Sequence, residues 1–308
     1  MTQRPFKQVD VFTAVPFQGN PLAVVLDASG LDDDAMQRFA RWTNLSETTF
    51  LLPPTQASAD YRVRIFTPGV ELPFAGHPTL GSCHAWLQAG GQPKTPGQVV
   101  QECGIGLVPI RREVGTQRLA FAAPPLKRSS PDLAMLSAVA TALGLDAPQI
   151  VAAQLLDNGP VWLGLLLDSV DSVLQLTPDY STLARLGVLI GVAAAYPLQA
   201  DAPPLIGRVN REALAFGARR SEANGDAPGL EVRAFTPGIA GNEDPVTGSL
   251  NASLAQWLIA DGRLPAHYLA SQGACLGRSG EVHVAQDAGG QVWVGGESVT
   301  CINGQATL

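Results

Sequence analysis

Two stretches of the chain repeat one pattern of hydrophobic and polar residues. Residues 64–87 read RIFTPGVELPFAGHPTLGSCHAWL, and residues 233–254 read RAFTPGIAGNEDPVTGSLNASL. Each stretch starts with a short run of β-type residues, which Pro-Gly ends, and continues into small and apolar residues over a helical length. Because a helix that is apolar nearly all round is buried, the pattern predicts one buried helix in each half, with strands wrapped about it.

The repeat also predicts where these helices begin. An alignment that gives the second copy two fewer loop residues pairs His77 with Asp244 and Pro78 with Pro245. Proline suits the first position of a helix, where its missing N–H would have no partner. We therefore expect His77 and Asp244 to be the N-cap residues of the two helices.

A repeat of this period indicates two related domains rather than a solenoid. The proline-rich stretch at residues 124–131 is the expected linker, which gives domains of residues 1–126 and 127–296. The C-terminal strand, within residues 297–308, is expected to return to the first domain.

The remaining pattern alternates short strands with a few helices, which indicates an α+β fold. Further helices are predicted at residues 32–43, 133–143 and 181–186. Strands are predicted at residues 7–12, 22–26, 44–52, 61–66, 98–103, 105–111, 118–121, 150–156, 162–167, 187–194, 213–218, 275–277, 281–286, 292–295 and 297–303.

Charge and length make several classes of partner poor candidates. A formal net charge of −7 and a pI near 5.1 provide no basic surface for nucleic acid or an anionic membrane. No apolar run is long enough to span a bilayer, and the first residues lack a signal-peptide core, so we expect a cytoplasmic protein. The four cysteines have neither CxxC nor another metal-ligand spacing, so no metal is expected.

The symmetry of the repeat predicts an anion site. If the two halves face each other about a pseudo-twofold axis, the N-termini of the two buried helices converge. Each helix start brings unpaired N–H groups and a partial positive charge. The simplest ligand for such a site is a small carboxylate.

Glu47 is a candidate for acid–base chemistry. In a strand over residues 44–52 it would share one face with Leu45 and Leu51. Burial there raises a carboxyl pKa from about 4.3 toward neutrality, as a general base at pH 7 requires. An edge-strand glutamate facing water would show the same pattern. Asn20, in a Gly-Asn-Pro turn, either reaches into the site or is only a turn residue.

The other candidates also have structural explanations. Asp244 before Pro245 is a strong N-cap signal, and Ser249 is a small residue that suits a crowded helix. His77 is harder to explain, because histidine is a poor cap and the helix dipole disfavours its charged form. Arg278, in Gly-Arg-Ser-Gly, would bind an anion or simply occupy a surface turn.

The motifs VDVFTAVPFQGNPLAVV, NLSETTFL, RIFTPGVELPFAGHPTLG, GNEDPVTGSL and QGACLGRSG resemble the phenazine-biosynthesis PhzF-like proteins, in the same order and over nearly the whole chain. The resemblance implies the diaminopimelate-epimerase fold. That fold has two pseudo-symmetric domains, each a β-barrel-like sheet around a central helix, with the active site in the cleft between them. It also implies a cofactor-independent isomerase that forms a homodimer, and the founding enzyme of the family isomerises trans-2,3-dihydro-3-hydroxyanthranilate.

Roles follow from the resemblance, motif by motif. Glu47 would be the catalytic acid/base, while His77 and Asp244 would bind an amino or hydroxyl group and steer the proton. Ser249 would donate a hydrogen bond near the substrate carboxylate. The backbone amides of Gly76 and Gly248 would help to hold that carboxylate, and Asn20 would be a further substrate-binding residue.

Two alternatives remain beside the isomerase. A racemase with two opposed thiols is disfavoured, because the helix starts carry Gly76-His77 and Glu243-Asp244 and no cysteine. A one-base racemase or epimerase stays open. A binding protein that holds a small anion without turnover is the alternative from another class.

Overall fold

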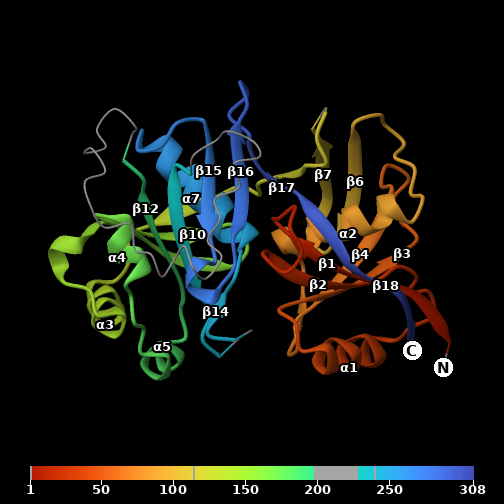
Figure 1. Ribbon diagram of the computed structural model, residues 1–308, viewed down its shortest axis with the longest axis horizontal. Helices are drawn as coiled ribbons and strands as arrows, with labels where there is room; N and C mark the ends of the chain where they lie inside the picture. Colours follow the sequence, from red (N-terminus) through yellow and green to blue (C-terminus); the bar gives the residue numbers. More distant parts are fainter. Residues whose placement is uncertain (1, 114, 198–227, 239–240) are drawn as a thin grey trace.

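The computed structural model describes residues 2–113, 115–197, 228–238 and 241–308. Two β-rich halves lie side by side, the N-terminal half in red to yellow and the C-terminal half in green to blue (Figure 1). The dark blue C-terminal segment runs back through the N-terminal half, so both chain ends lie together. In the described part of the chain, no helix is long and apolar enough to cross a membrane.

The N-terminal half contains β1 (Gln3–Val11), β2 (Asn20–Val25), α1 (Asp33–Thr43), β3 (Thr48–Leu52), β4 (Tyr61–Phe66), β5 (Glu71–Leu72), α2 (Gly76–Gln88), β6 (Gln98–Cys103), β7 (Gly106–Arg112) and β8 (Leu119–Ala122). The chain continues with β9 (Lys127–Ser129), α3 (Leu133–Leu143), η1 (Ala147–Gln149), β10 (Ile150–Asp157), β11 (Val161–Leu167), α4 (Val170–Leu174), α5 (Tyr180–Leu186), β12 (Leu189–Ala195), β13 (Leu230–Phe235), β14 (Glu243–Asp244), α7 (Gly248–Ala260), β15 (His267–Gln272), η2 (Ala274–Leu276), β16 (Gly280–Gln286), β17 (Val292–Gly296) and β18 (Ser298–Thr307).

The strand pairing of one half is repeated in the other. β1 and β2 pair antiparallel, β2 and β3 parallel, β3 and β4 antiparallel, and β4 and β6 parallel. β10 to β15 follow the same sequence of pairings. The halves are also joined, because β8 pairs with β17 and β18 pairs with β1. The domain boundaries at residues 126 and 296 stay a prediction.

The two apolar helices are buried among the strands, as their patterns predict. α2 packs on β1, β2 and β8, and α7 packs on β10, β16 and β17. Leu80 of α2 and Leu250 and Trp257 of α7 belong to one continuous core with the sheet. Each fully buried side chain of this size contributes about 1.5–3 kcal/mol to folding, so the two helices anchor both halves.

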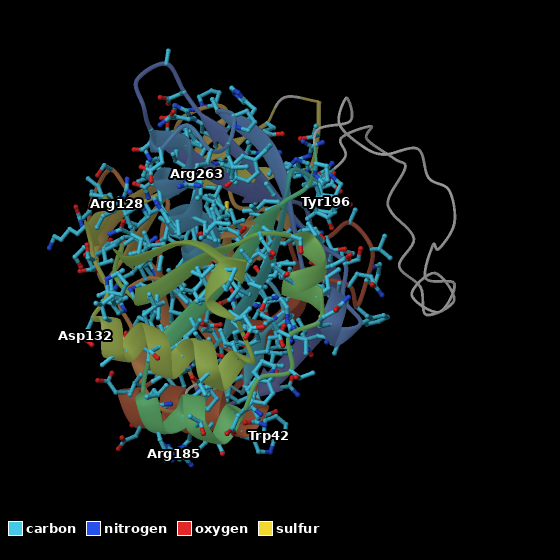
Figure 2. All side chains as sticks on the ribbon, turned by 90° about the vertical axis from the view of Figure 1, so that its left-hand side faces the viewer. Trp42, Arg128, Asp132, Arg185, Tyr196 and Arg263 are labelled. Carbon is cyan, nitrogen blue, oxygen red and sulfur yellow. The ribbon has the colours of Figure 1, made fainter. Side chains whose placement is uncertain are left out.

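The amphipathic helices cover the outer faces of the sheet. α1 packs its apolar side on Phe50 and Phe66 of β3 and β4. α3 and α5 lie together over β10, β11 and β12 (Figure 2). β3, β4 and β10 to β12 are therefore covered on their outer faces by helices.

Glu47 does not lie on a strand face. Asn44 ends α1 in the left-handed conformation, and β3 begins only at Thr48. The prediction of one strand over residues 44–52 is therefore wrong at its start, because the helix before it uses part of that segment. Glu47 reaches the interior from the loop between α1 and β3.

Other differences have local causes. Residues 275–277, predicted as a strand, lie in the turn η2, because Gly273 and Gly277 adopt positive φ angles that an extended strand does not permit. β15 and the short α4 have no periodic pattern and were not predicted. The expected linker contains β9, which pairs with β10. The strand predicted at residues 213–218 lies outside the described residues.

The structure also corrects the alignment of the repeat. Arg64 and Arg233 each donate from Nε and Nη2 to the two carboxylate oxygens of one glutamate, Glu71 and Glu243 respectively. The separations are 7 and 10 residues, so the second copy has three more loop residues, not two fewer. The extra residues precede Glu243.

The predicted N-caps are therefore wrong. Helix α2 starts at Gly76 with Ala75 as its N-cap, and α7 starts at Gly248 with Thr247 as its N-cap. His77 lies inside the first turn of α2, whereas Asp244 precedes α7 and lies in β14. In the corrected alignment, His77 corresponds to Ser249.

Candidate active site

The N-termini of α2 and α7 meet at two glycines. A methyl group added to Gly248 would lie 2.9 Å from the Cα atom of Gly76, so the two backbones touch. Neither N-cap, Ala75 or Thr247, makes a side-chain cap hydrogen bond in the described chain, and neither first turn contains an acidic residue. The helix starts therefore converge, as predicted, and their N–H groups and partial positive charges are available to an anion.

Glu47 and His77 face each other at the start of α2. Glu47 Oε2 and His77 Nε2 are 3.4 Å apart, and the side chains are 14% and 4% exposed. Neither atom has a hydrogen-bond partner among the described residues. Burial raises the pKa of Glu47 well above its usual range, and the charge of Asp244 raises it further. Burial lowers the pKa of His77 to about 3, so its imidazole is neutral at pH 7.

Asp244 reaches the same place from the C-terminal half. Its carboxylate accepts hydrogen bonds from the Thr247 hydroxyl at 2.6 Å and the Asn20 amide at 2.8 Å, and one from Ser46. Burial raises the pKa of Asp244 to about 6, although these hydrogen bonds oppose the rise. Sequence reasoning missed Thr247 and Ser46, although each lies within three residues of a predicted site residue in the same motif.

Asn20 ties the two halves together. Its side-chain nitrogen donates to Asp244 Oδ1 and, at 2.9 Å, to the Val246 carbonyl, and it lies 3.5 Å from His77 Nδ1. Two oxygen acceptors fix the orientation of this amide, because only its NH2 group donates. His77 Nδ1 lies beside this NH2 group, whose two hydrogens point to the two oxygen acceptors, and His77 Nε2 faces Glu47. The donors of Asn20 are engaged within the protein, and only Oδ1 lacks a partner among the described residues.

Ser249 lies next to the glycine contact, in the first turn of α7. Its Oγ accepts a hydrogen bond from Trp162 Nε1 at 3.3 Å, and its carbonyl accepts one from Asn158 at 2.9 Å. An indole N–H can only donate, so the hydroxyl proton of Ser249 points elsewhere and remains available to a ligand. Among the described residues, Ser249 makes no hydrogen bond to Glu47 or Asp244.

Gln272 is a buried residue that sequence reasoning missed. Its amide donates to the Asp244 carbonyl and the Thr247 hydroxyl, both at 3.0 Å. Its oxygen accepts from the Thr247 N–H and the Asn251 side chain. All donors of Gln272 are thus used to hold the segment that carries Asp244. The only signal in the sequence was its place at the start of the motif QGACLGRSG, since β15 itself was not predicted.

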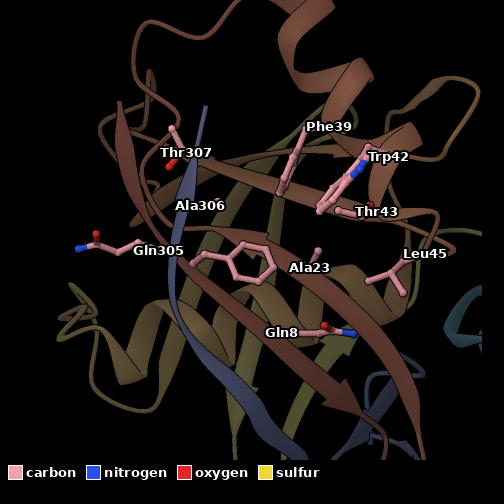
Figure 3. A pocket seen from close by; sticks show the side chains of 10 residues that line it. Gln8, Ala23, Phe39, Trp42, Thr43, Leu45, Gln305, Ala306 and Thr307 are labelled. Atoms are coloured by element: carbon pink, nitrogen blue, oxygen red, sulfur yellow. The ribbon is translucent and has the colours of Figure 1, made fainter. Parts of the chain in front are cut away.

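A groove of about 490 Å³ lies elsewhere, on the outside of the N-terminal half. Phe39 and Trp42 of α1 lie side by side along it, and Leu45 lies further along (Figure 3). Phe6 of β1 also lines the groove. None of the predicted site residues lines this groove. The candidate site is therefore the polar cluster at the helix starts.

Comparison with known proteins gives close relatives over the full chain. A family model described as "Phenazine biosynthesis-like protein" (PhzC-PhzF) matches residues 9–304. The chain is 35% identical to "Antisense-enhancing sequence 1" of Schizosaccharomyces pombe, covering 100% of both chains. It is 32% identical to the trans-2,3-dihydro-3-hydroxyanthranilate isomerase of Pseudomonas aeruginosa, covering 97% of this chain and 98% of that one. A crystal structure of a PhzF-family protein from Bacillus anthracis has the same mixed α/β fold, with a TM-score of 0.78, 22% identity and 100% coverage of both chains.

Proposed function

The chain belongs to the PhzC-PhzF family of phenazine biosynthesis-like proteins, and from this premise we propose that it is a cofactor-independent isomerase. It moves a proton on a small, carboxylate-bearing substrate by general acid–base catalysis. The chemistry is similar to that named for the trans-2,3-dihydro-3-hydroxyanthranilate isomerase of Pseudomonas aeruginosa. The family resemblance in the motifs is thereby confirmed, whereas the substrate and the roles of the site residues are part of the proposal.

One observation carries the proposal. A buried carboxyl oxygen of Glu47 and the Nε2 atom of His77 lie 3.4 Å apart, and neither has a hydrogen-bond partner among the described residues. Orphaned polar atoms of this kind are costly unless a ligand uses them. A raised carboxyl pKa beside a neutral imidazole is the arrangement that lets Glu47 both take and return a proton near pH 7.

Substrate binding is assigned to the converging helix starts. The carboxylate of the substrate would accept hydrogen bonds from the backbone N–H groups of Gly76 and Gly248 and from the Ser249 hydroxyl. The partial positive charges of both helices favour the anion. Asp244, with its pKa raised to about 6, would accept a hydrogen bond from an amino or hydroxyl group of the substrate.

The proton transfer needs no co-reactant. The Glu47 carboxylate takes a proton from an activated substrate carbon, and the electron pair of the C–H bond shifts into the adjacent π system. The protonated Glu47 then returns the proton to another carbon on the same face, which restores the carboxylate and leaves an isomer. His77 Nε2–H would hydrogen-bond to the Glu47 carboxylate and limit its motion. General acid–base catalysis of this type supplies about 10²–10⁴-fold in rate, and positioning supplies the rest.

Proton NMR in D₂O with a panel of small cyclic and amino carboxylates tests this function. We expect deuterium to enter one compound with the wild type and with Glu71→Gln, a control in an exposed ion pair, and not with Glu47→Gln. Exchange at an α-carbon with inversion of configuration would instead indicate the one-base racemase. Binding detected by saturation transfer, with no exchange in any compound, would favour the binding protein.

Three further expectations accompany this proposal. The active site would lie in the cleft between two domains, the chain would form a homodimer, and it would work in the cytoplasm. Light scattering of the purified protein measures the oligomeric state directly.

A further inference from the structure

The turn between β1 and β2 has an unusual backbone. Phe12 and Phe17 have positive φ angles of 65° and 71°. This region is unfavourable for bulky side chains, and such residues keep it only where the surroundings impose it. Phe12 is fully buried, whereas the Phe17 side chain is 70% exposed, so packing of its ring does not hold Phe17 in place.

Polar contacts from both halves hold this turn. From the N-terminal half, the Asp10 carboxylate accepts the Gly19 N–H at 3.0 Å. From the C-terminal half, Arg278 Nη1 donates to the Phe17 carbonyl at 3.0 Å and lies 3.4 Å from the Gly19 carbonyl. The Ser279 N–H also donates to the carbonyl of residue 18 at 2.8 Å. The turn is thus held between the Asp10 carboxylate of one half and the Arg278 guanidinium of the other.

The turn at residues 17–19 is followed directly in the chain by a residue of the candidate site. Gly19 fits so tightly that an added Cβ would lie 2.1 Å from the Val11 carbonyl oxygen. The next residue, Asn20, donates to Asp244. The loop that carries Arg278 contacts the site from the other side, because a Cβ on Gly273 would lie 2.8 Å from both Arg278 Cβ and the Pro245 carbonyl.

We propose that Arg278 is a positioning residue of the acid–base site: it holds the turn at residues 17–19 against the C-terminal half, so that the Asn20 amide stays hydrogen-bonded to Asp244. Arg278 is therefore neither an anion ligand nor a simple surface turn residue. Its effect on turnover rests on the proposed function, whereas its effect on the Asn20 amide does not.

Loss of Arg278 would also change the titration of Asp244. The groups that act on Asp244 are Asn20, Thr247 and Ser46, which stabilise its carboxylate, and Glu243 and Glu47, which repel it. His77 is neutral and adjoins through Asn20. Without the Asn20 hydrogen bond, the pKa of Asp244 rises, and the acidic limb of the pH–rate profile moves to higher pH.

The first measurement follows the side-chain NH2 of Asn20 by NMR in Arg278→Ala, Arg278→Lys and wild type, with Asn20→Ala to assign the signal. We expect slow hydrogen exchange in the wild type, exchange faster by about tenfold or more in Arg278→Ala, and intermediate protection in Arg278→Lys. Arg128→Ala is the matched control, because Arg128 lies at the surface (Figure 2) and pairs with Asp261 rather than with the turn. Equal protection in Arg278→Ala and Arg128→Ala would overturn the proposal.

The second measurement uses the exchange reaction on the substrate found above. Arg278→Ala should lower kcat by about tenfold or more, and the double variant with Asn20→Ala should be no slower than Asn20→Ala alone, because both changes remove one interaction. Fully additive effects would contradict a role through Asn20. If no compound is turned over, the proposed function fails, and the Asn20 amide still decides the role of Arg278.

Discussion

Glu243→Gln should destabilise the protein far more than Glu71→Gln, although the repeat gives both glutamates the same ion pair. In each half an arginine contacts both carboxylate oxygens, at 2.7 and 2.5 Å for Glu71 and at 2.9 and 2.8 Å for Glu243. The two ion pairs differ in how deeply they are buried. The side chains of Arg233 and Glu243 are 5% and 4% exposed, whereas those of Arg64 and Glu71 are 16% and 41% exposed.

The size of the destabilisation follows from the partners that each arginine retains after the substitution. Without the Glu243 charge, Arg233 retains hydrogen bonds to the backbone carbonyls of Val173 and Leu176 and a contact with the face of the Phe235 ring, 4.9 Å from its centroid. No other carboxylate in the described chain is hydrogen-bonded to it. Breaking a buried pair on one side costs about 3–5 kcal/mol. Arg64 retains Asp33 and the solvent, and an exposed pair contributes about 0–1 kcal/mol. We expect the two variants to differ by about 3 kcal/mol in the free energy of unfolding.

Urea unfolding, followed by tryptophan fluorescence and circular dichroism, measures this difference. With an m-value of about 3 kcal/mol/M, the midpoint of Glu243→Gln should fall about 1 M below that of Glu71→Gln. A double variant, Arg233→Met with Glu243→Met, should be more stable than Glu243→Gln, since no charge is left buried alone. Equal midpoints for the two single variants would refute the reasoning that burial decides the contribution of the pair.

Two further predictions follow from the site. Gly248→Ala should abolish proton exchange, because its Cβ would lie 2.9–3.1 Å from backbone atoms of Gly76 and His77. Gly69→Ala is the control and should retain exchange, because its Cβ would have only one contact, at 3.9 Å. Equal activity of the two variants would contradict the assigned contact between the helices. Asp244 has a folded-state pKa of about 6 against 3.8 for the free side chain, so the folded state binds more protons between these values and stability falls as pH rises from 4 to 6. The free energy of unfolding falls by up to about 3 kcal/mol over this pH range. In Asp244→Asn the urea midpoint should fall less steeply with pH than in the wild type. The same slope in both proteins would contradict the prediction.

The elements of the fold that are set by local patterns could be predicted from the sequence. The buried helices and α3 agree with prediction because each forms from one continuous run of small and apolar residues, which is a local property of the sequence. The N-caps could not be predicted, because the alignment of the two copies depends on which glutamate each arginine binds. That choice is a tertiary contact, and proline alone pointed to the wrong register.

The residues of the candidate site also fall into those that the sequence could identify and those that it could not. Glu47, His77 and Asp244 were identifiable because they lie in distinctive motifs, and the structure brings them together. Gln272 was not identifiable, since it acts on Asp244 from a strand 28 residues further along the chain. Arg278 was noticed, but whether it binds an anion or another part of the chain depends on where the turn at residues 17–19 lies.

The corrected repeat explains why the chain carries the proposed acid–base site once and not twice. Pairing with Phe66 and Phe235 makes Thr48 equivalent to Ile190, so Glu47 corresponds to Leu189. Pairing within β4–β5 and β13–β14 makes Asp244 correspond to Leu72. The fold thus offers each site position twice, and at both of these positions the second place holds a leucine. Contact between the two helix starts then brings Glu47 and His77 of one half close to Asp244 of the other, and Asn20 lies between His77 and Asp244. A symmetric pair of sites would not combine residues of both halves in this way.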